Sequence, residues 1–167
     1  ETGTLLAVRL KPGIGMDNAE RLLSEVGITG YIEQGDMRVY EARVFDGITQ
    51  RQRLVLEHRN GSLSSTSVIV GPDRYNDPDE MKDIFGHIRS KLLRQLGQPY
   101  EVVEHGEFTA SLAEDIISGR FERTMQWKAD SGVVLLAIPK RLDGRLRVEV
   151  IYSGETGGSS MGLQQIQ

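Results

Sequence analysis

Residues 51–97 read RQRLVLEHRNGSLSSTSVIVGPDRYNDPDEMKDIFGHIRSKLLRQLG and carry the clearest structural signals of the chain. Two runs rich in branched aliphatic residues, 51–58 and 62–70, predict strands. Asn60-Gly61 lies between them and accepts the positive φ angles of a two-residue hairpin turn. The remainder predicts a long helix, so we expect an α+β fold with an antiparallel sheet.

The predicted helix spans residues 78–96, and its apolar residues recur on one face at helical spacing. Asp77 is expected to cap the free amides of the first turn, with Glu80 as its capping-box partner. Pro78 suits the first helical position, where its missing N–H costs nothing. Gly97 follows the last apolar residue and predicts the end of the helix.

Similar elements are predicted on both sides of this region. A first helix is expected over residues 17–26, capped by Asp17 with Glu20, and a weaker helical pattern covers residues 108–118. Period-two alternation and turn residues predict further strands at 37–45, 121–128, 133–138 and 145–152.

The two halves of the sequence look alike. Asn60-Gly61 and Asp143-Gly144 each lead through a strand to a glycine, at a constant shift of 83 residues (143 minus 60). We therefore predict two similar halves, each with one helix and about three antiparallel strands, packed into one compact unit. The expected order is an N-terminal strand or extended segment at 1–12, the two halves at 13–71 and 72–153, and a flexible glycine- and serine-rich tail at 154–167.

Composition limits the classes of function. The chain has 20 basic and 24 acidic residues, so no excess of positive charge favours nucleic acid as a partner. No apolar run approaches the roughly 20 residues of a membrane-spanning helix. The chain has no cysteine, which excludes disulfides and thiolate chemistry within it. It begins at Glu1 without methionine, as either a mature exported protein or a trimmed chain would.

The candidate contact residues lie on exposed strand faces and on one loop. Arg74 and Tyr75, between Gly71 and the cap at Asp77, are the first candidates because this loop is the least easily buried. Trp127 and Tyr152 alternate with apolar neighbours and are expected in the core. The strand faces turned away from the helices are expected to expose Glu41, Arg43, Arg53, Val55, Glu57, Arg145, Arg147, Glu149 and Ile151.

No motif predicts catalysis, a metal or a cofactor. His58, His87 and His105 lack the close spacing of a helical zinc site. Residues 158–162 match G-x-S-x-G, but the tail offers neither the strand nor the helix that the catalytic turn requires. No catalytic residue is therefore predicted.

The pattern resembles a known kind of domain. Gly15-Met16, Ala19, Leu22, Leu23 and Gly27 are similar to the helix entry of BamE/SmpA-like and β-lactamase-inhibitor-protein-like domains. Leu92, Leu96, Gly97 and Pro99 resemble a helix ending of such exported bacterial proteins, and Trp127 and a closing strand ending in Tyr152 follow, so the resemblance covers most of residues 13–153.

The resemblance implies an extracytoplasmic, periplasmic-type bacterial α+β domain whose concave sheet or loops bind a protein. Such a domain works within an envelope assembly or as an enzyme inhibitor. The chain departs from these domains by lacking their lipid-attachment cysteine and disulfides, and residues 108–118 are an insertion.

We therefore expect a non-enzymatic protein-binding or inhibitory module, with Arg74, Tyr75, Arg43, Arg53, Arg145 and Arg147 as candidate contacts. One alternative is an enzyme or small-ligand carrier whose site lies between the halves, with His58, His105 or Glu104 as titratable groups. Another is a structural domain of a larger envelope protein.

Overall fold

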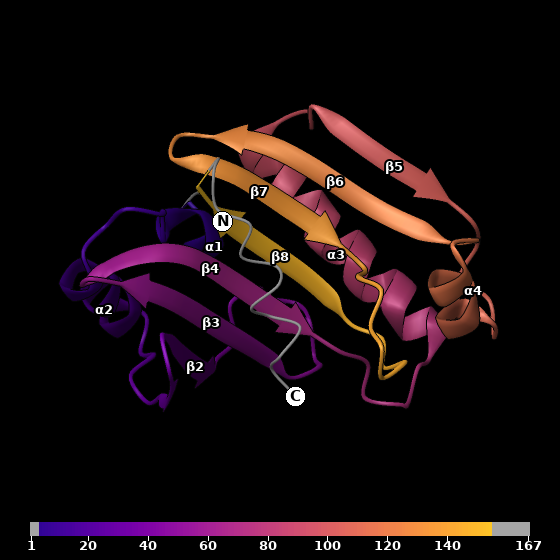
Figure 1. Cartoon of the computed structure of the whole chain (residues 1–167), viewed down its shortest axis with the longest axis horizontal. Helices are drawn as coiled ribbons and strands as arrows, with labels where there is room; N and C mark the ends of the chain where they lie inside the picture. The colour runs from indigo at the N-terminus through magenta and orange to yellow at the C-terminus, as the bar shows by residue number, and fades with distance from the viewer. Residues whose placement is uncertain (1–3, 155–167) are drawn as a thin grey trace.

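The computed structural model describes residues 4–154, and it confirms the α+β class. One eight-stranded antiparallel sheet runs in the order β1-β2-β3-β4-β8-β7-β6-β5 (Figure 1). The strands are β1 Ile32–Gln34, β2 Met37–Glu41, β3 Gln52–Arg59, β4 Ser62–Val70, β5 Glu101–His105, β6 Glu122–Ala129, β7 Gly132–Ala137 and β8 Val148–Ser153. The helices are α1 Leu6–Arg9, α2 Met16–Glu25, α3 Pro78–Leu96 and α4 Leu112–Ser118.

The predicted pair of three-stranded halves is not what the chain forms. β4 pairs with β8, so the strands before and after α3 join in one continuous sheet. The boundary between β4 and β8 divides the sheet equally, with β1 to β4 on one side and β5 to β8 on the other. The additional strands, β1 and β5, lie at the two edges, and the sequence prediction missed both of them.

The β3–β4 hairpin is confirmed. Asn60 and Gly61 both have positive φ angles, 54° and 77°, as a tight hairpin turn of this kind requires. β4 has the predicted bounds, and β3 is shifted by one residue from its predicted span.

Helix α3 also has its predicted bounds, and Asp77 caps it by accepting from the amides of Asp79 and Glu80. The Glu80 side chain does not complete the predicted capping box. It accepts instead from the backbone amides of Asp73 and Arg74, at 2.8 and 3.0 Å, and so orders the loop before the helix.

The predicted cap of the first helix is wrong. α2 begins one residue earlier than expected, at Met16, with Gly15 as its N-cap and no capping side chain. The reason is a tertiary contact, because the Met16 amide donates to the Gly61 carbonyl oxygen in the hairpin turn, at 2.9 Å. Glu20 pairs with Arg38 on β2 instead of with the helix backbone.

The N-terminal segment differs from the extended strand that the sequence predicted. Leu6–Arg9 forms the short helix α1, because Ala7, Val8 and Leu10 are buried in the main core. The second predicted helix of the later half is also shorter than expected, and α4 occupies only its last seven residues. The predicted tail and the G-x-S-x-G match lie outside the described residues, except for Gly154.

The main core lies between one face of the sheet and helices α1, α2 and α3, with α4 at its margin. Figure 1 shows α3 behind β8, β7 and β6. Trp127 and Tyr152 are buried here, as predicted, and the Trp127 Nε1–H donates to the Gly97 carbonyl oxygen at 2.8 Å. Within residues 4–154, each helix is too short or too polar to cross a membrane.

The opposite face of the sheet is less exposed than the sequence predicted. Val39, Val55, Ser67, Ile151 and Leu135 lie side by side across β2, β3, β4, β8 and β7. Val55 and Ile151 are buried in a second small apolar cluster, which corrects their expected exposure. Ile151 lies on β8, which would be an edge strand of a separate second sheet and is a central strand in the continuous one. Arg147 and Glu149 are buried too, which corrects their expected exposure.

Candidate functional site

A pocket of about 260 Å³ lies where two loops leave the centre of the sheet. Val70, the last residue of β4, pairs with Val148, the first residue of β8. The loop after β4, residues 71–77, and the loop before β8, residues 138–147, therefore start from the same place. Strand pairing brings together segments about 70 residues apart, and the pocket forms between them.

Asn76 ties the two loops together. Its side-chain Nδ2–H donates to the Gly144 carbonyl oxygen at 2.9 Å, and its Oδ1 accepts from the Leu146 amide at 2.9 Å. Asn76 has a positive φ angle of 50°, which asparagine tolerates better than most residues. These two bonds connect the loops that border the pocket.

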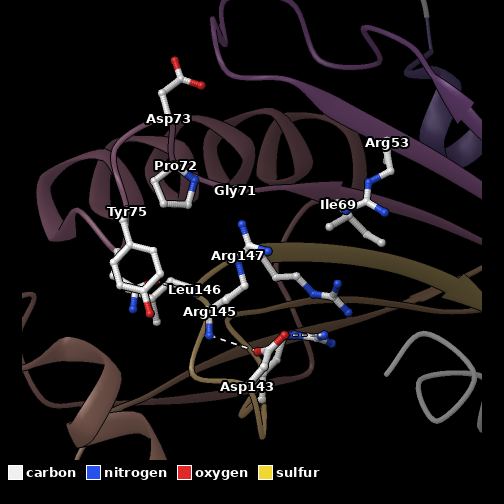
Figure 2. Close-up of a pocket in the computed structure, with 12 residues that line it drawn as sticks. Arg53, Ile69, Gly71, Pro72, Asp73, Tyr75, Asp143, Arg145, Leu146 and Arg147 are labelled. Atoms are coloured by element: carbon white, nitrogen blue, oxygen red, sulfur yellow. Dashed lines mark hydrogen bonds and ion pairs between the residues drawn. The ribbon is translucent and has the colours of Figure 1, made fainter. Parts of the chain in front are cut away.

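Four arginine side chains line the pocket. Arg53 comes from β3, Arg141 and Arg145 come from the loop before β8, and Arg147 directly precedes β8. In Figure 2, Arg53 lies on the opposite side of the pocket from Tyr75, and the Asp73 carboxylate points away from the arginine side chains. Arg141 and Arg147 are only 8% and 7% exposed, so two guanidinium groups are held in a largely desolvated place.

Nearby carboxylates offset part of this charge. Arg147 forms an ion pair with Glu149, which is 4% exposed, and Arg141 Nη2 lies 3.2 Å from Asp143 Oδ2. Burial lowers the pKa of Arg147, and repulsion by the neighbouring Arg141 and Arg53 acts in the same direction, while Glu149 opposes both. Burial raises the pKa of Glu149, against the attraction of Arg147. Repulsion between like charges is therefore part of the built-in electrostatics of the pocket.

A second network stiffens the loop after β4. Arg74 pairs with Asp77 at 2.8 Å and with Glu80 at 3.2 Å. Glu80 also accepts from Gln50 Nε2 at 2.8 Å. Hydrogen bonds from Gln50 and from the amides of Arg74 and Asp73 lower the pKa of Glu80 to about 2. This network holds the loop in one conformation on the N-terminus of α3.

Two large apolar side chains stand exposed on the loops that form the pocket. Tyr75 is 75% exposed and lines the pocket, and Leu142, next to Arg141, is fully exposed. Both belong to loops that hydrogen bonds fix in place. Exposed aromatic and aliphatic side chains on a rigid support, beside arginines, are the residue types that anchor protein interfaces.

The structure brings four of the six predicted contact residues into this pocket: Tyr75, Arg53, Arg145 and Arg147. Arg74 lies beside it but holds the loop rather than lining the pocket. Arg43 is not part of the site, because its Nη1–H donates to the Ile48 carbonyl oxygen at 2.6 Å.

Sequence reasoning missed Arg141 and Leu142, which lie between the predicted strands at 133–138 and 145–152. The concentration of basic residues around Asp143-Gly144, with Lys140, Arg141, Arg145 and Arg147 within eight positions, was the available signal.

The two histidines of the alternative site lie far apart in the sheet. His58 lies on β3 and His105 on the edge strand β5, with four strands between them. His58 Nε2 lies 3.8 Å from Glu33, and His105 Nε2 lies 3.7 Å from Glu122. Glu104 is next to Arg123. In the described part of the chain, no group of three or more histidine, aspartate or glutamate side chains is placed to hold a metal ion.

Comparison of the chain with protein-family models, with curated proteins and with solved structures finds no match. By its fold and site, the protein is an α+β domain with one antiparallel sheet. An arginine-lined pocket lies where two loops leave the central strands of that sheet.

Proposed function

We propose that this chain is a non-enzymatic protein-binding module, and that its partner docks on the two loops around the arginine-lined pocket. The observation that carries the proposal is that exposed Tyr75 and Leu142 lie on the two loops whose pocket is lined by four arginines, one of them from strand β3. Hydrogen bonds already hold the backbone of both loops, so binding requires little further ordering of the loops, which favours affinity.

The docking surface is defined as Tyr75, Leu142, Arg53, Arg141, Arg145 and Arg147. It combines four guanidinium groups with two exposed apolar side chains, so a partner that fits must offer an apolar contact and at least one acidic group. Among the described lining residues, no nucleophile lies beside a general base, so the chemistry of the pocket favours binding over catalysis.

The location of the module is part of the proposal. The resemblance of residues 13–153 to BamE/SmpA-like and β-lactamase-inhibitor-protein-like domains supports an extracytoplasmic, bacterial setting. In that setting, the partner is an envelope protein or an enzyme that the module inhibits. The absence of cysteine is compatible with either.

The test is a comparative capture experiment. The full chain, immobilised, is exposed to cell-envelope extract at about 150 mM salt, where charge attraction is screened beyond roughly 8 Å. A Tyr75→Ala/Leu142→Ser variant and an Ile117→Ser control are treated in parallel. Ile117 is exposed on α4 and does not line the pocket, so its replacement removes apolar surface without changing either loop.

We expect one or a few proteins to be retained by the wild-type chain and by the control, and lost from the double variant. The proposal fails if the three chains retain the same proteins, or if the double variant retains the partner as well as the control does.

A further inference from the structure

The arginine cluster is costly for the protein to maintain. Arg141 and Arg147 are more than nine-tenths buried, and Arg53 and Arg141 both repel Arg147. Placing like charges together in a desolvated site opposes folding. Strained electrostatics of this kind concentrate at functional sites, where a ligand of opposite charge relieves them.

The charges around the pocket can be counted. The lining contains four arginines and two aspartates, Asp73 and Asp143, and the Glu149 carboxylate pairs with Arg147. The Asp73 carboxylate points away from the arginine side chains (Figure 2), so the four arginines face two negative charges, those of Asp143 and Glu149. This leaves an excess of positive charge that an anionic ligand would offset.

We propose that the pocket binds one carboxylate group, supplied by an acidic side chain of the partner, and that an apolar residue next to it contacts Tyr75 and Leu142. This inference rests on the proposed function and names the chemistry of the partner's anchor. The recognised element is an acidic residue followed or preceded by an apolar one, in an exposed segment of the partner.

The Asp143 carboxylate favours a carboxylate ligand over a phosphate group. Asp143 presents its Oδ2 to Arg141 and its Oδ1 to the Arg145 amide, so a negative charge already occupies part of the anion-facing surface. A phosphate monoester near neutral pH carries close to two negative charges, whereas a carboxylate carries one. A ligand with two negative charges would be repelled more strongly by Asp143 than a ligand with one. Arginine's planar fork matches a carboxylate with two parallel hydrogen bonds.

The test uses blocked tetrapeptides as probes, because the partner is unidentified. The acidic probe is acetyl-Gly-Glu-Leu-Gly-amide, and its matched relatives replace Glu by Gln or by phosphoserine, or Leu by Gly. Each is titrated to millimolar concentration into the isotope-labelled full chain, and binding is followed by amide chemical shifts. We expect the acidic probe to shift the amides of residues 73–76 and 143–147 and to leave those of α2 and β1 unchanged.

The Gln probe should bind at least about tenfold more weakly than the acidic probe, because a charge-assisted hydrogen-bond pair is lost. The Gly-for-Leu probe should bind more weakly as well. Equal binding of the Glu and Gln probes would overturn the inference. Tighter binding of the phosphoserine probe, or binding of inorganic phosphate but of no peptide, would assign the site to phosphate and overturn it too.

A variant pair separates the pocket from general charge attraction. Arg145→Gln removes one lining guanidinium from an exposed side chain, so the fold is retained, and it should weaken the acidic probe about tenfold. Arg51→Gln makes the same charge change at a side chain that is 84% exposed and outside the pocket, and should leave affinity within about twofold. Equal effects of the two variants would contradict a specific site.

The two proposals fail in different ways. If capture depends on Tyr75 and Leu142 but the Arg145→Gln variant captures normally, the protein-binding function stands and the carboxylate anchor is wrong. If capture depends neither on Tyr75 and Leu142 nor on Arg145, both proposals are wrong.

Discussion

Replacing Asn76 tests whether the two pocket loops are held by one side chain. The Asn76→Ala variant removes both bridging hydrogen bonds, to the Gly144 carbonyl oxygen and from the Leu146 amide. It also forces alanine into a positive φ angle of 50°. Asn76→Gly removes the same hydrogen bonds but relieves the backbone conformation, because glycine has no Cβ.

The magnitudes follow from these two contributions. Each partly buried hydrogen bond contributes about 1 kcal/mol net, and a left-handed conformation costs alanine about 1–2 kcal/mol. Asn76→Ala should therefore lower the free energy of unfolding by about 3–4 kcal/mol, and Asn76→Gly by only about 1–2 kcal/mol. Asn60 provides the matched control, since its φ angle of 54° is nearly the same and its exposed side chain makes no hydrogen bond within the described residues. Asn60→Ala should cost about 1–2 kcal/mol.

The assay is equilibrium urea unfolding of the three variants and the wild type, followed by the fluorescence of Trp127, the single tryptophan of the chain. Trp127 is buried in the folded protein, so its emission reports global unfolding. Asn76→Ala should also shift the amide signals of residues 143–147. If Asn76→Ala costs no more than Asn60→Ala, the bridging hydrogen bonds contribute nothing and the loops are held by other contacts.

Three further predictions concern stability. The pKa of Glu80 is lowered from 4.5 to about 2, so its stabilising contribution is complete above pH 4.5 and is lost as the pH falls toward 2. In unfolding measurements between these pH values, the free energy of unfolding of the Glu80→Gln variant should therefore depend less on pH than that of the wild type. Glu149→Gln removes the counter-charge of buried Arg147 and should cost about 3–5 kcal/mol in urea unfolding, while Arg147→Met/Glu149→Leu should cost clearly less; equal losses would contradict the ion-pair argument. Trp127→Phe loses the hydrogen bond to the Gly97 carbonyl oxygen and some core volume. It should lower the free energy of unfolding by about 2 kcal/mol and lower the thermal midpoint. An unchanged midpoint in calorimetry would show that this bond does not hold the end of α3.

The best-predicted elements have chemical signals at both ends. Helix α3 begins at the Asp77 cap and ends at Gly97, and β4 begins after the Asn60-Gly61 turn, so their bounds follow from local chemistry. Edge strands β1 and β5 are short and have mostly exposed side chains, so no apolar alternation marks them. The Asp17 cap was mispredicted because a tertiary bond from the Met16 amide to Gly61 sets the start of α2.

The main feature that local sequence patterns could not predict was the joining of all strands in one sheet. It depends on β4 pairing with β8, which lie about 80 residues apart in sequence. One signal was available, because Val68-Ile69-Val70 and Val150-Ile151-Tyr152 are continuously apolar, as strands buried on both faces are. Treating each strand as having one exposed face led to the wrong exposure for Val55, Ile151, Arg147 and Glu149.

The site was partly accessible from sequence. Exposed strand positions and a loop that was hard to bury led to Tyr75, Arg53, Arg145 and Arg147, which the structure places around one pocket. Their convergence required the β4–β8 pairing and the Asn76 bonds, neither of which is visible in the sequence.

The central claim is that the pocket loops contact a protein partner, and site-specific photocrosslinking tests it most directly. A p-benzoylphenylalanine at position 142, in place of fully exposed Leu142, is compared with the same group at position 117 on α4 in producing cells. The account predicts a covalent adduct with a discrete protein from position 142, reduced by excess acetyl-Gly-Glu-Leu-Gly-amide, and none from position 117. Equal adducts from both positions, or no adduct from position 142, would contradict it.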